Sequence, residues 1–378
     1  MSDRREIPIV DLAPGLRAHE PELLAALSRV LRSGTFIGGP EVDAFEAELA
    51  AYLGVRAVVG VNSGTDALCI ALRGLDVRAG DEVLVPAFGF IASAEAVSAV
   101  GGVPVFVDVE PGSLNVDPAA IDAAVTPRTK GIIAVHLFGQ AAAMDEILER
   151  CDALGLWVLE DAAQALGGRH RRGRVGSLGR AAALSFFPTK NLGACGDGGA
   201  ISTDDLHLAR AARSLRQHGS RTKYVSERLG HNSRLDALQA TLLRVRLPGL
   251  DASIEGRRAA AARYDALLGE TGLELPWRDP RSHHTFHQYT VRIAGAQRDA
   301  VQRRLVERGI GAVVHYPLPL HLQPVYRQRA CDAAGERRLP HAEAACRSVL
   351  SLPLWPEISL DDQRRVASAL VEALAEVG

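Results

Sequence analysis

Short apolar runs alternate with helical segments between residues 56 and 160, and this alternation restricts the fold more than any other feature of the sequence. The runs are β-branched and apolar on both faces, so each predicts a strand that is covered from two sides. The expected strands are Arg56 to Val61, Glu82 to Pro86, Val103 to Val107, Gly131 to His136 and Leu156 to Glu160, and the helices between them are Thr65 to Arg73, Ile91 to Val100 and Met144 to Leu154. This order predicts an α/β fold with a large, mostly parallel sheet covered by helices.

Helices precede this alternating region, and a unit of different character follows it. Pro248 interrupts the helical pattern, and a smaller mixed unit begins there. The expected helices are Glu20 to Arg32, Glu41 to Leu53, Leu235 to Arg246, Ile254 to Leu268, Arg298 to Arg308 and Asp361 to Val377, with one strand at Tyr289 to Ile293. We therefore predict a large domain over residues 1–248 and a smaller C-terminal α+β domain over residues 249–378.

The composition argues against several classes of function. The 378 residues carry a formal net charge of -2, which provides no overall positive field for nucleic acid. The five cysteines are scattered, Cys331 among them, and include no Cys-x-x-Cys pair, so neither a disulfide framework nor a metal site is expected. We find no signal peptide and no apolar run of membrane-spanning length. We expect a cytoplasmic protein that contacts neither nucleic acid nor membrane.

Lys190 stands between an apolar, aromatic run and a glycine-rich turn. The run begins at Ala182 and predicts a further strand, and the turn contains Gly193, Gly196, Gly198 and Gly199. An amine held on a rigid strand edge beside a pocket can have a lowered pKa and form a Schiff base. The alternative interpretation is a surface lysine at a strand end.

A possible phosphate site precedes the first helix of the alternating region. The segment Asn62-Ser-Gly-Thr-Asp66 lies between an expected strand and an expected helix. A Ser-Gly-Thr turn at a helix N-terminus offers free N–H groups, a hydroxyl and the positive end of the helix dipole, which together bind phosphate. The alternative is an ordinary helix N-cap, because Ser and Thr are favoured at that position.

Two further strand ends carry an aromatic ring and a carboxylate. Phe90 would stand at the upper edge of the sheet, where an aromatic ring can stack on a flat cofactor ring. The alternative interpretation of Phe90 is a residue of the hydrophobic core. Asp161 ends another apolar strand, and a buried carboxylate needs a partner such as a cationic ring nitrogen. A helix N-cap is the alternative role for Asp161.

These strand-end residues together meet the requirements of pyridoxal phosphate. Lys190 would form the Schiff base, and Asp161 would keep the ring nitrogen protonated so that the ring accepts electrons. The turn Asn62-Ser-Gly-Thr-Asp66 would hold the phosphate. Nucleotide-binding motifs fit less well, because the sequence contains no Gly-x4-Gly-Lys-Ser/Thr and no Gly-x-Gly-x-x-Gly that opens a helix.

Two longer segments accompany these strand-end residues, Val135-His-Leu-Phe-Gly139 and Gly230-His-Asn-Ser-Arg-Leu-Asp-Ala-Leu-Gln-Ala240. Together they closely resemble the DegT/DnrJ/StrS family of sugar aminotransferases, and the resemblance extends over about Ile7 to Leu354. The resemblance implies the aspartate aminotransferase fold, which is fold type I among pyridoxal phosphate enzymes. By the same resemblance, Lys190 forms the Schiff base and Asp161 contacts the ring nitrogen. The remaining cofactor contacts that the resemblance implies are Phe90 and Gln164 at the ring, Gly64, Thr65 and Ser185 at the phosphate, and Asn232 from the neighbouring subunit of a homodimer.

The resemblance also favours amino transfer over dehydration. Sugar dehydratases of the same superfamily replace the lysine with histidine, whereas this chain keeps Lys190. His231 stands where many family members have tyrosine, which we interpret as a difference on the substrate side. The segment from His231 to Asp236 resembles the branch that aminates C-3 of a dTDP-linked 3-keto-6-deoxy sugar, with glutamate as the implied amino donor.

The substrate-side candidates come from two segments. A basic stretch would contact the diphosphate or form a solvated loop, and it contains Arg216, His218, Arg221, Lys223, Arg228, His231 and Arg234. The individual candidate substrate residues are Tyr224, Arg234, His315, Tyr316 and His321. Structural roles are the alternative for the two histidines of this set.

Two other functions remain open on the sequence alone. One is a C-4 nucleotide-sugar or cyclitol aminotransferase. The other, from a different class, is a non-catalytic regulator that binds the cofactor. The presence of both Lys190 and Asp161 weighs against the regulator, which needs neither group.

Overall fold

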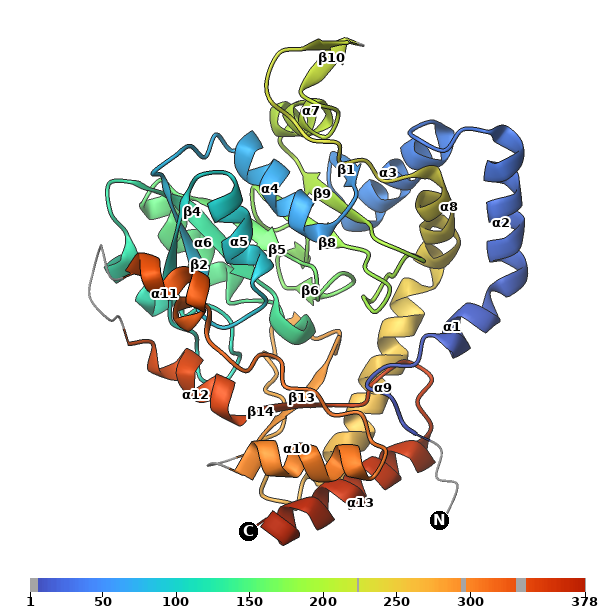
Figure 1. Ribbon diagram of the computed structural model, residues 1–378, viewed down its shortest axis with the longest axis vertical. Helices are drawn as coiled ribbons and strands as arrows, with labels where there is room; N and C mark the ends of the chain where they lie inside the picture. The colour runs from blue at the N-terminus through green and yellow to red at the C-terminus, as the bar shows by residue number, and fades with distance from the viewer. Residues whose placement is uncertain (1–5, 223, 294–296, 331–337, 378) are drawn as a thin grey trace.

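Seven strands form the central sheet in the order β1-β9-β8-β5-β4-β2-β3, as the computed structural model shows (Figure 1). The strands are β1 (Ala57–Val61), β2 (Glu82–Pro86), β3 (Val103–Val107), β4 (Thr129–Val135), β5 (Trp157–Asp161), β8 (Ala181–Ser185) and β9 (Gly199–Thr203). The structure describes residues 6–222, 224–293, 297–330 and 338–377, so the predictions that involve Lys223 and Cys331 fall outside the described residues.

The predicted mostly parallel sheet is confirmed. Within it, β9 runs antiparallel to both of its neighbours, β1 and β8, while the other strands share one direction. The register places Gly199 between Val61 and Ser185, so the ends of β1 and β8 lie on either side of it. Because the carboxyl ends of the parallel strands meet at one edge, the residues that follow them are brought together there.

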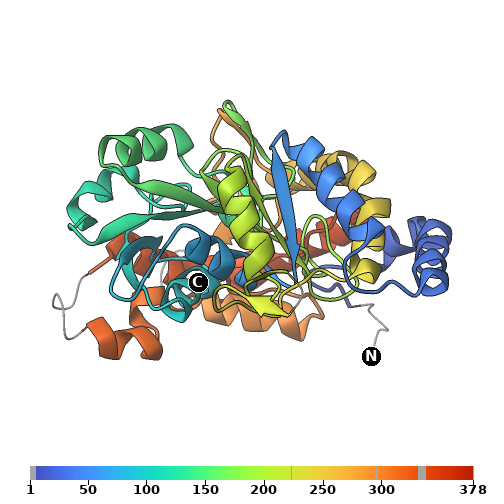
Figure 2. The ribbon, with the colours of Figure 1, turned by 90° about the horizontal axis from the view of Figure 1, so that it is seen from above.

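Helices cover both faces of the sheet because successive side chains of a strand point to opposite faces. In β2, Val83 and Val85 join one hydrophobic core, and Leu84 between them joins another. One face packs against α4 (Gly64–Gly74), α5 (Ala92–Ala99) and α7 (Leu206–Leu215), and the other against α3 (Pro40–Leu53), α6 (Met144–Ala153) and α8 (Ala237–Arg246). Seen from above, α6 and the N-terminal α2 (Glu20–Ser33) lie at opposite sides of the molecule (Figure 2).

The C-terminal unit has its own hydrophobic core below the sheet in Figure 1. Two antiparallel strands pair with Tyr289 opposite Leu352, and helices pack around them. The elements are α9 (Leu250–Leu268), β13 (Tyr289–Arg292), α10 (Arg298–Glu307), β14 (Val349–Leu352) and α13 (Leu360–Val377). The predicted smaller α+β unit is therefore confirmed, and the boundary between residues 248 and 249 remains our proposal.

The N-terminal segment packs against the core of the C-terminal unit, and two C-terminal helices pack against the core of the large sheet. Ile7 is buried in the C-terminal core, where its N–H donates to the carbonyl of Gly309 at 2.9 Å. Conversely, Tyr326 of α11 (Pro324–Ala330) and Cys346 of α12 (Pro340–Ser348) are buried in the core of the large sheet. Among the described residues, no helix is long and apolar enough to cross a membrane.

Candidate active site

The N-terminus of α4 lies against the end of β8. Ser63 caps the helix, because its hydroxyl accepts a hydrogen bond from the N–H of Asp66 at 3.1 Å. The first turn leaves the N–H groups of Gly64 and Thr65 without partners inside the helix. A Cβ atom on Gly64 would lie 2.8 Å from the Cβ of Ser185, so only glycine permits this approach. The turn is thus both an N-cap and a cradle in which an anion would meet the N–H groups of α4 and the hydroxyl of Ser185.

Asp161 is the last residue of β5, and two donors orient its carboxylate. The hydroxyl of Ser93 donates to Oδ2 at 2.7 Å, and the N–H of Ala163 donates to Oδ1 at 3.2 Å. The side chain is only 8% exposed. A turn follows Asp161 in the chain, so the alternative interpretation of this residue as a helix N-cap is wrong. The carboxylate is therefore held at the sheet edge with a defined direction.

Lys190 follows β8 and is half-buried. Burial lowers the pKa of its amine, and the nearby carboxylate of Asp161 opposes this shift. No hydrogen bond or ion pair joins the amine of Lys190 to any side chain that the structure describes. The chain therefore holds a lysine amine near a carboxylate without tying it to a protein partner.

Gln164, Tyr316 and Phe90 lie together beside these residues. The amide oxygen of Gln164 accepts from the N–H of Phe138 at 2.7 Å, and its Nε2 lies 2.9 Å from the Tyr316 hydroxyl. The ring of Tyr316 lies 6.0 Å from that of Phe90. Phe90 is 55% exposed, so its interpretation as a core residue is wrong; Phe88 occupies the core instead. An exposed aromatic face is thus available at the sheet edge.

Two histidines of the C-terminal unit face the same region. His315 has Nδ1 3.0 Å from both Nε2 of Gln288 and the hydroxyl of Ser351, and burial followed by the charge of Lys190 lowers its pKa to about 4. His287 is buried, and its Nδ1 has no hydrogen-bond partner among the residues that the structure describes. Burial and the Lys190 charge hold its pKa well below the usual value. The sequence reasoning missed His287, although three histidines between residues 283 and 287 could have indicated it.

His321 has other neighbours. Its Nε2 lies 3.7 Å from Oε1 of Glu343, and its ring centre lies 6.4 Å from that of Phe106. Burial lowers its pKa, and the charges of Glu343 and Asp108 oppose this shift. These contacts are separate from those of Lys190, so the structure does not group His321 with the residues around the lysine.

The basic stretch projects from the molecule as a hairpin of β10 (Ser220–Thr222) and β11 (Val225–Ser226), at the top of Figure 1 and nearest the viewer in Figure 2. Tyr224 at its turn is 91% exposed. Arg216 is instead buried in an ion pair with Glu46, so its assignment to a diphosphate-binding patch is wrong.

Asn232 and Arg234 follow this hairpin and contact each other. Asn232 is exposed, and its side-chain oxygen accepts a hydrogen bond from Arg234 at 2.6 Å. The N-cap of α8 is Asp236, so Asn232 does not cap that helix. Among the described residues, no hydrogen bond or ion pair joins Asn232 or Arg234 to the group around Lys190.

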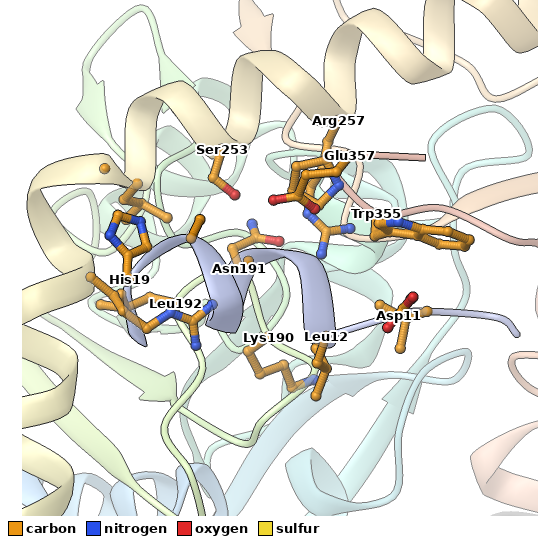
Figure 3. Close-up of a pocket in the computed structure, with 17 residues that line it drawn as sticks. Asp11, Leu12, His19, Lys190, Asn191, Leu192, Ser253, Arg257, Trp355 and Glu357 are labelled. Atoms are coloured by element: carbon orange, nitrogen blue, oxygen red, sulfur yellow. The ribbon is translucent and has the colours of Figure 1, made fainter. Parts of the chain in front are cut away.

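A cavity of about 100 Å³ adjoins Lys190 on the side of the C-terminal unit (Figure 3). The lysine lies on one side of it with Leu12, and α9 contributes Ser253 and Arg257 from the opposite side. Lys190 thus borders a space between the two units.

The residues present fit pyridoxal phosphate. The glycine-lined cradle at α4 suits a phosphate, the exposed ring of Phe90 suits a flat heterocycle, and the buried carboxylate of Asp161 suits a protonated ring nitrogen. The unpaired amine of Lys190 supplies the group for covalent attachment.

The model of the DegT/DnrJ/EryC1/StrS aminotransferase family matches residues 18–371. A transaminase of Streptomyces venezuelae, "dTDP-3-amino-3,4,6-trideoxy-alpha-D-glucose transaminase", is 47% identical over 98% of each chain. A "pleiotropic regulatory protein" of Geobacillus stearothermophilus is 46% identical over 97% of this chain and 98% of its own. The crystal structure of S. venezuelae DesV with a ketimine intermediate has a TM-score of 0.93, with 46% identity over 98% of each chain.

Proposed function

The chain belongs to the DegT/DnrJ/EryC1/StrS aminotransferase family, and we propose that it uses pyridoxal phosphate to transfer an amino group from glutamate to C-3 of a dTDP-linked 3-keto-6-deoxyhexose. The observation that carries the proposal is the amine of Lys190, which is unpaired among the described residues and lies within the electrostatic influence of Asp161. The transaminase of S. venezuelae supports C-3 and dTDP, because its name specifies both.

The residues around the lysine have distinct tasks in this reaction. When bound, pyridoxal phosphate supplies an electron-accepting ring that takes up negative charge from the reacting carbon. Asp161, oriented by Ser93, would accept a hydrogen bond from the protonated ring nitrogen. Lys190 would move a proton to and from the reacting carbon through Nζ, and burial favours the neutral amine that this step requires. Phe90 and Gln164 would confine the ring from its sides.

The phosphate would lie at the N-terminus of α4. Gly64 and Thr65 would donate from their N–H groups, and Ser185 would donate from its hydroxyl. The close approach of Gly64 to Ser185 supports this assignment, because it brings donors from two elements to one point.

We also propose a homodimer with shared active sites. The exposed Asn232 and its half-buried hydrogen-bond partner Arg234 would reach the phosphate and substrate of the partner subunit. Tyr224 on the projecting hairpin would contact the nucleotide sugar there. His315 and Tyr316 would face the sugar from this subunit.

The cysteines of the described residues form no disulfide, which supports a cytoplasmic location.

The proposal is tested most directly in the reverse direction, where the substrates are stable. A dTDP-3-amino-3,6-dideoxyhexose and 2-oxoglutarate should give glutamate at a rate proportional to enzyme, and the matched dTDP-4-amino isomer should react far more slowly. Faster reaction of the C-4 isomer would contradict the C-3 assignment and favour a C-4 enzyme.

A regulator is the second candidate, because a relative of nearly the same length carries a regulatory name. An aminotransferase turns over an amino sugar and releases glutamate, whereas a non-catalytic regulator does not. If cofactor-loaded protein releases no glutamate from either amino sugar or from an aminocyclitol, the aminotransferase proposal fails and the regulator is favoured.

A further inference from the structure

Arg257 is a buried cation without a counterion among the described residues. It is 4% exposed, and no ion pair joins it to a described carboxylate. Its Nη1 meets the carbonyl oxygens of His287, Phe286 and Leu354 only at 3.3 to 3.4 Å, and its buried Nε has no hydrogen-bond partner in the described part of the chain. A buried guanidinium in these surroundings is costly unless an anion completes its contacts.

The same arginine lines the cavity that Lys190 lines. In Figure 3 its side chain descends from α9 toward the centre of the cavity, across from the lysine. A second cation, Arg246, also lines this space and donates to the carbonyl of Gly193 in the turn that follows Lys190. Burial lowers the pKa of Arg257 to about 10, and the charge of Arg246 acts in the same direction. The cavity thus concentrates positive charge beside the reacting amine.

Two carboxylates also line the cavity, and neither neutralises Arg257. Glu357 raises the pKa of Arg257 but forms no ion pair with it among the described residues, and its side chain is exposed. Asp11 accepts a hydrogen bond from the N–H of Ala13 at 2.9 Å through Oδ1. An incoming anion would therefore find Arg257 still able to bind it.

We propose that this cavity binds the amino donor, and that Arg257 holds one of its carboxylates. The inference rests on the proposed function, since it assigns a site to the donor of that reaction. A guanidinium binds a carboxylate through two parallel N–H donors, which fixes both position and direction. A dicarboxylic amino acid held in this way would have its amino group in the space that Lys190 lines. The nucleotide sugar would occupy the other side, toward Phe90 and Tyr316.

Glutarate is a suitable probe, because it carries both carboxylates of glutamate and lacks the reacting amine. Its affinity for the cofactor-loaded enzyme is measured by calorimetry in the wild type and in the Arg257→Gln, Arg257→Lys and Arg258→Gln variants. Arg258 is a matched control, since it follows on α9 and contacts the carbonyl of His284 at 3.1 Å. We expect glutarate affinity to fall at least about tenfold in Arg257→Gln, less in Arg257→Lys, and under twofold in Arg258→Gln.

A second titrant separates the donor from the nucleotide sugar, whose phosphates are also anions. The affinity for dTDP should be the same in all four proteins. Equal glutarate affinity in wild type and Arg257→Gln overturns the inference, and so does a loss confined to dTDP. If Arg257→Gln does not fold, Arg257→Lys and Arg246→Gln replace it in the test. Wild-type glutarate affinity in both of these variants overturns the inference. A wild type that binds glutarate through Arg257 but aminates no dTDP sugar contradicts the proposed function and supports the donor site.

Discussion

Ser93 donates a 2.7 Å hydrogen bond from its hydroxyl to Oδ2 of Asp161, and both side chains are buried. Ser93 lies in the first turn of α5, and Asp161 ends β5, so two separate elements fix the direction of the carboxylate. We predict that Asp161→Asn lowers the rate of the half-reaction with glutamate on the order of a hundredfold. Ser93→Ala should lower it about tenfold, because a hydrogen bond to a charged group is lost while the charge remains.

Stopped-flow absorbance of the cofactor measures both rates. Ser98→Ala is the control on the same helix, since Ser98 contacts Tyr326 and lies outside the site. Cofactor affinity should stay close to that of the wild type in every variant, because the phosphate contacts remain. A rate for Ser93→Ala equal to that of Ser98→Ala would remove Ser93 from the site.

Lys190→Ala should abolish covalent attachment of the cofactor. The sequence contains three lysines, so the assignment is easily checked. After borohydride reduction, peptide mass spectrometry should find the cofactor on Lys190 in the wild type and in Lys130→Ala. Lys130 is a suitable control because it is exposed and pairs with Asp81 at 3.7 Å. Label on either other lysine would show that the assignment of Lys190 is wrong.

How much of this site the sequence could predict depends on how local its contacts are. Lys190 and Asp161 were found because Asp161 ends an apolar strand and Lys190 comes shortly after another, and a charged residue near a strand end is conspicuous in the sequence. The phosphate turn was found for the same reason, since helix caps and glycines lie within a few residues of each other. The sheet order then brings these strand ends together.

Ser93 and Arg257 could not be found in this way. Their relation to the site depends on how α5, α9 and the C-terminal unit pack against the sheet, and no local pattern encodes that packing. The basic stretch shows the opposite error. Arg216 was counted with its neighbours in sequence, but the structure pairs it with Glu46, which lies 170 residues away in the chain.

Gly64→Ala should weaken cofactor binding without preventing folding. The added Cβ would lie 2.8 Å from the Cβ of Ser185, so the cradle would have to open and the phosphate donors would separate. We expect at least a tenfold rise in the dissociation constant of pyridoxal phosphate, about the loss of one charge-assisted hydrogen bond. Fluorescence titration of the apoenzyme measures it.

Gly196→Ala is the matched control, because its Cβ would make only ordinary contacts with Gln239 at 3.4 Å. A dissociation constant for Gly64→Ala within twofold of this control would contradict the placement of the phosphate at α4.

Acid should destabilise the protein partly through His284. Burial lowers the pKa of this histidine to about 3, and its Nδ1 accepts a hydrogen bond from the N–H of Phe286 at 2.9 Å. The unfolded chain binds the proton near pH 6.5, so the free energy of unfolding falls as the pH decreases from about 6.5 toward 3. Urea unfolding measured across this range should show a smaller fall for His284→Asn, whose side-chain oxygen can accept the same hydrogen bond. The exposed His207→Asn should keep the wild-type slope, and equal slopes in both variants would exclude His284 as a cause.

The position of the exposed Asn232 and the half-buried Arg234 leads to the last prediction, which concerns the shared site. Their side chains contact each other, and the hairpin before them projects from the subunit. If these residues serve the partner's site, two inactive variants with defects in different places should restore activity when they are mixed. If they serve their own subunit, both sites of every mixed dimer are damaged.

The test combines Lys190→Ala with the double variant Asn232→Ala, Arg234→Ala, each nearly inactive alone. A mixed dimer with shared sites carries both defects in one site and leaves the other site intact. Random reassortment makes about half of the dimers mixed, so about a quarter of wild-type activity should return after subunit exchange. Distinct affinity tags on the two variants allow the mixed dimer to be isolated, and its activity should be about half that of the wild type. Isolated mixed dimers as inactive as the two parents would show that each chain carries its own complete site.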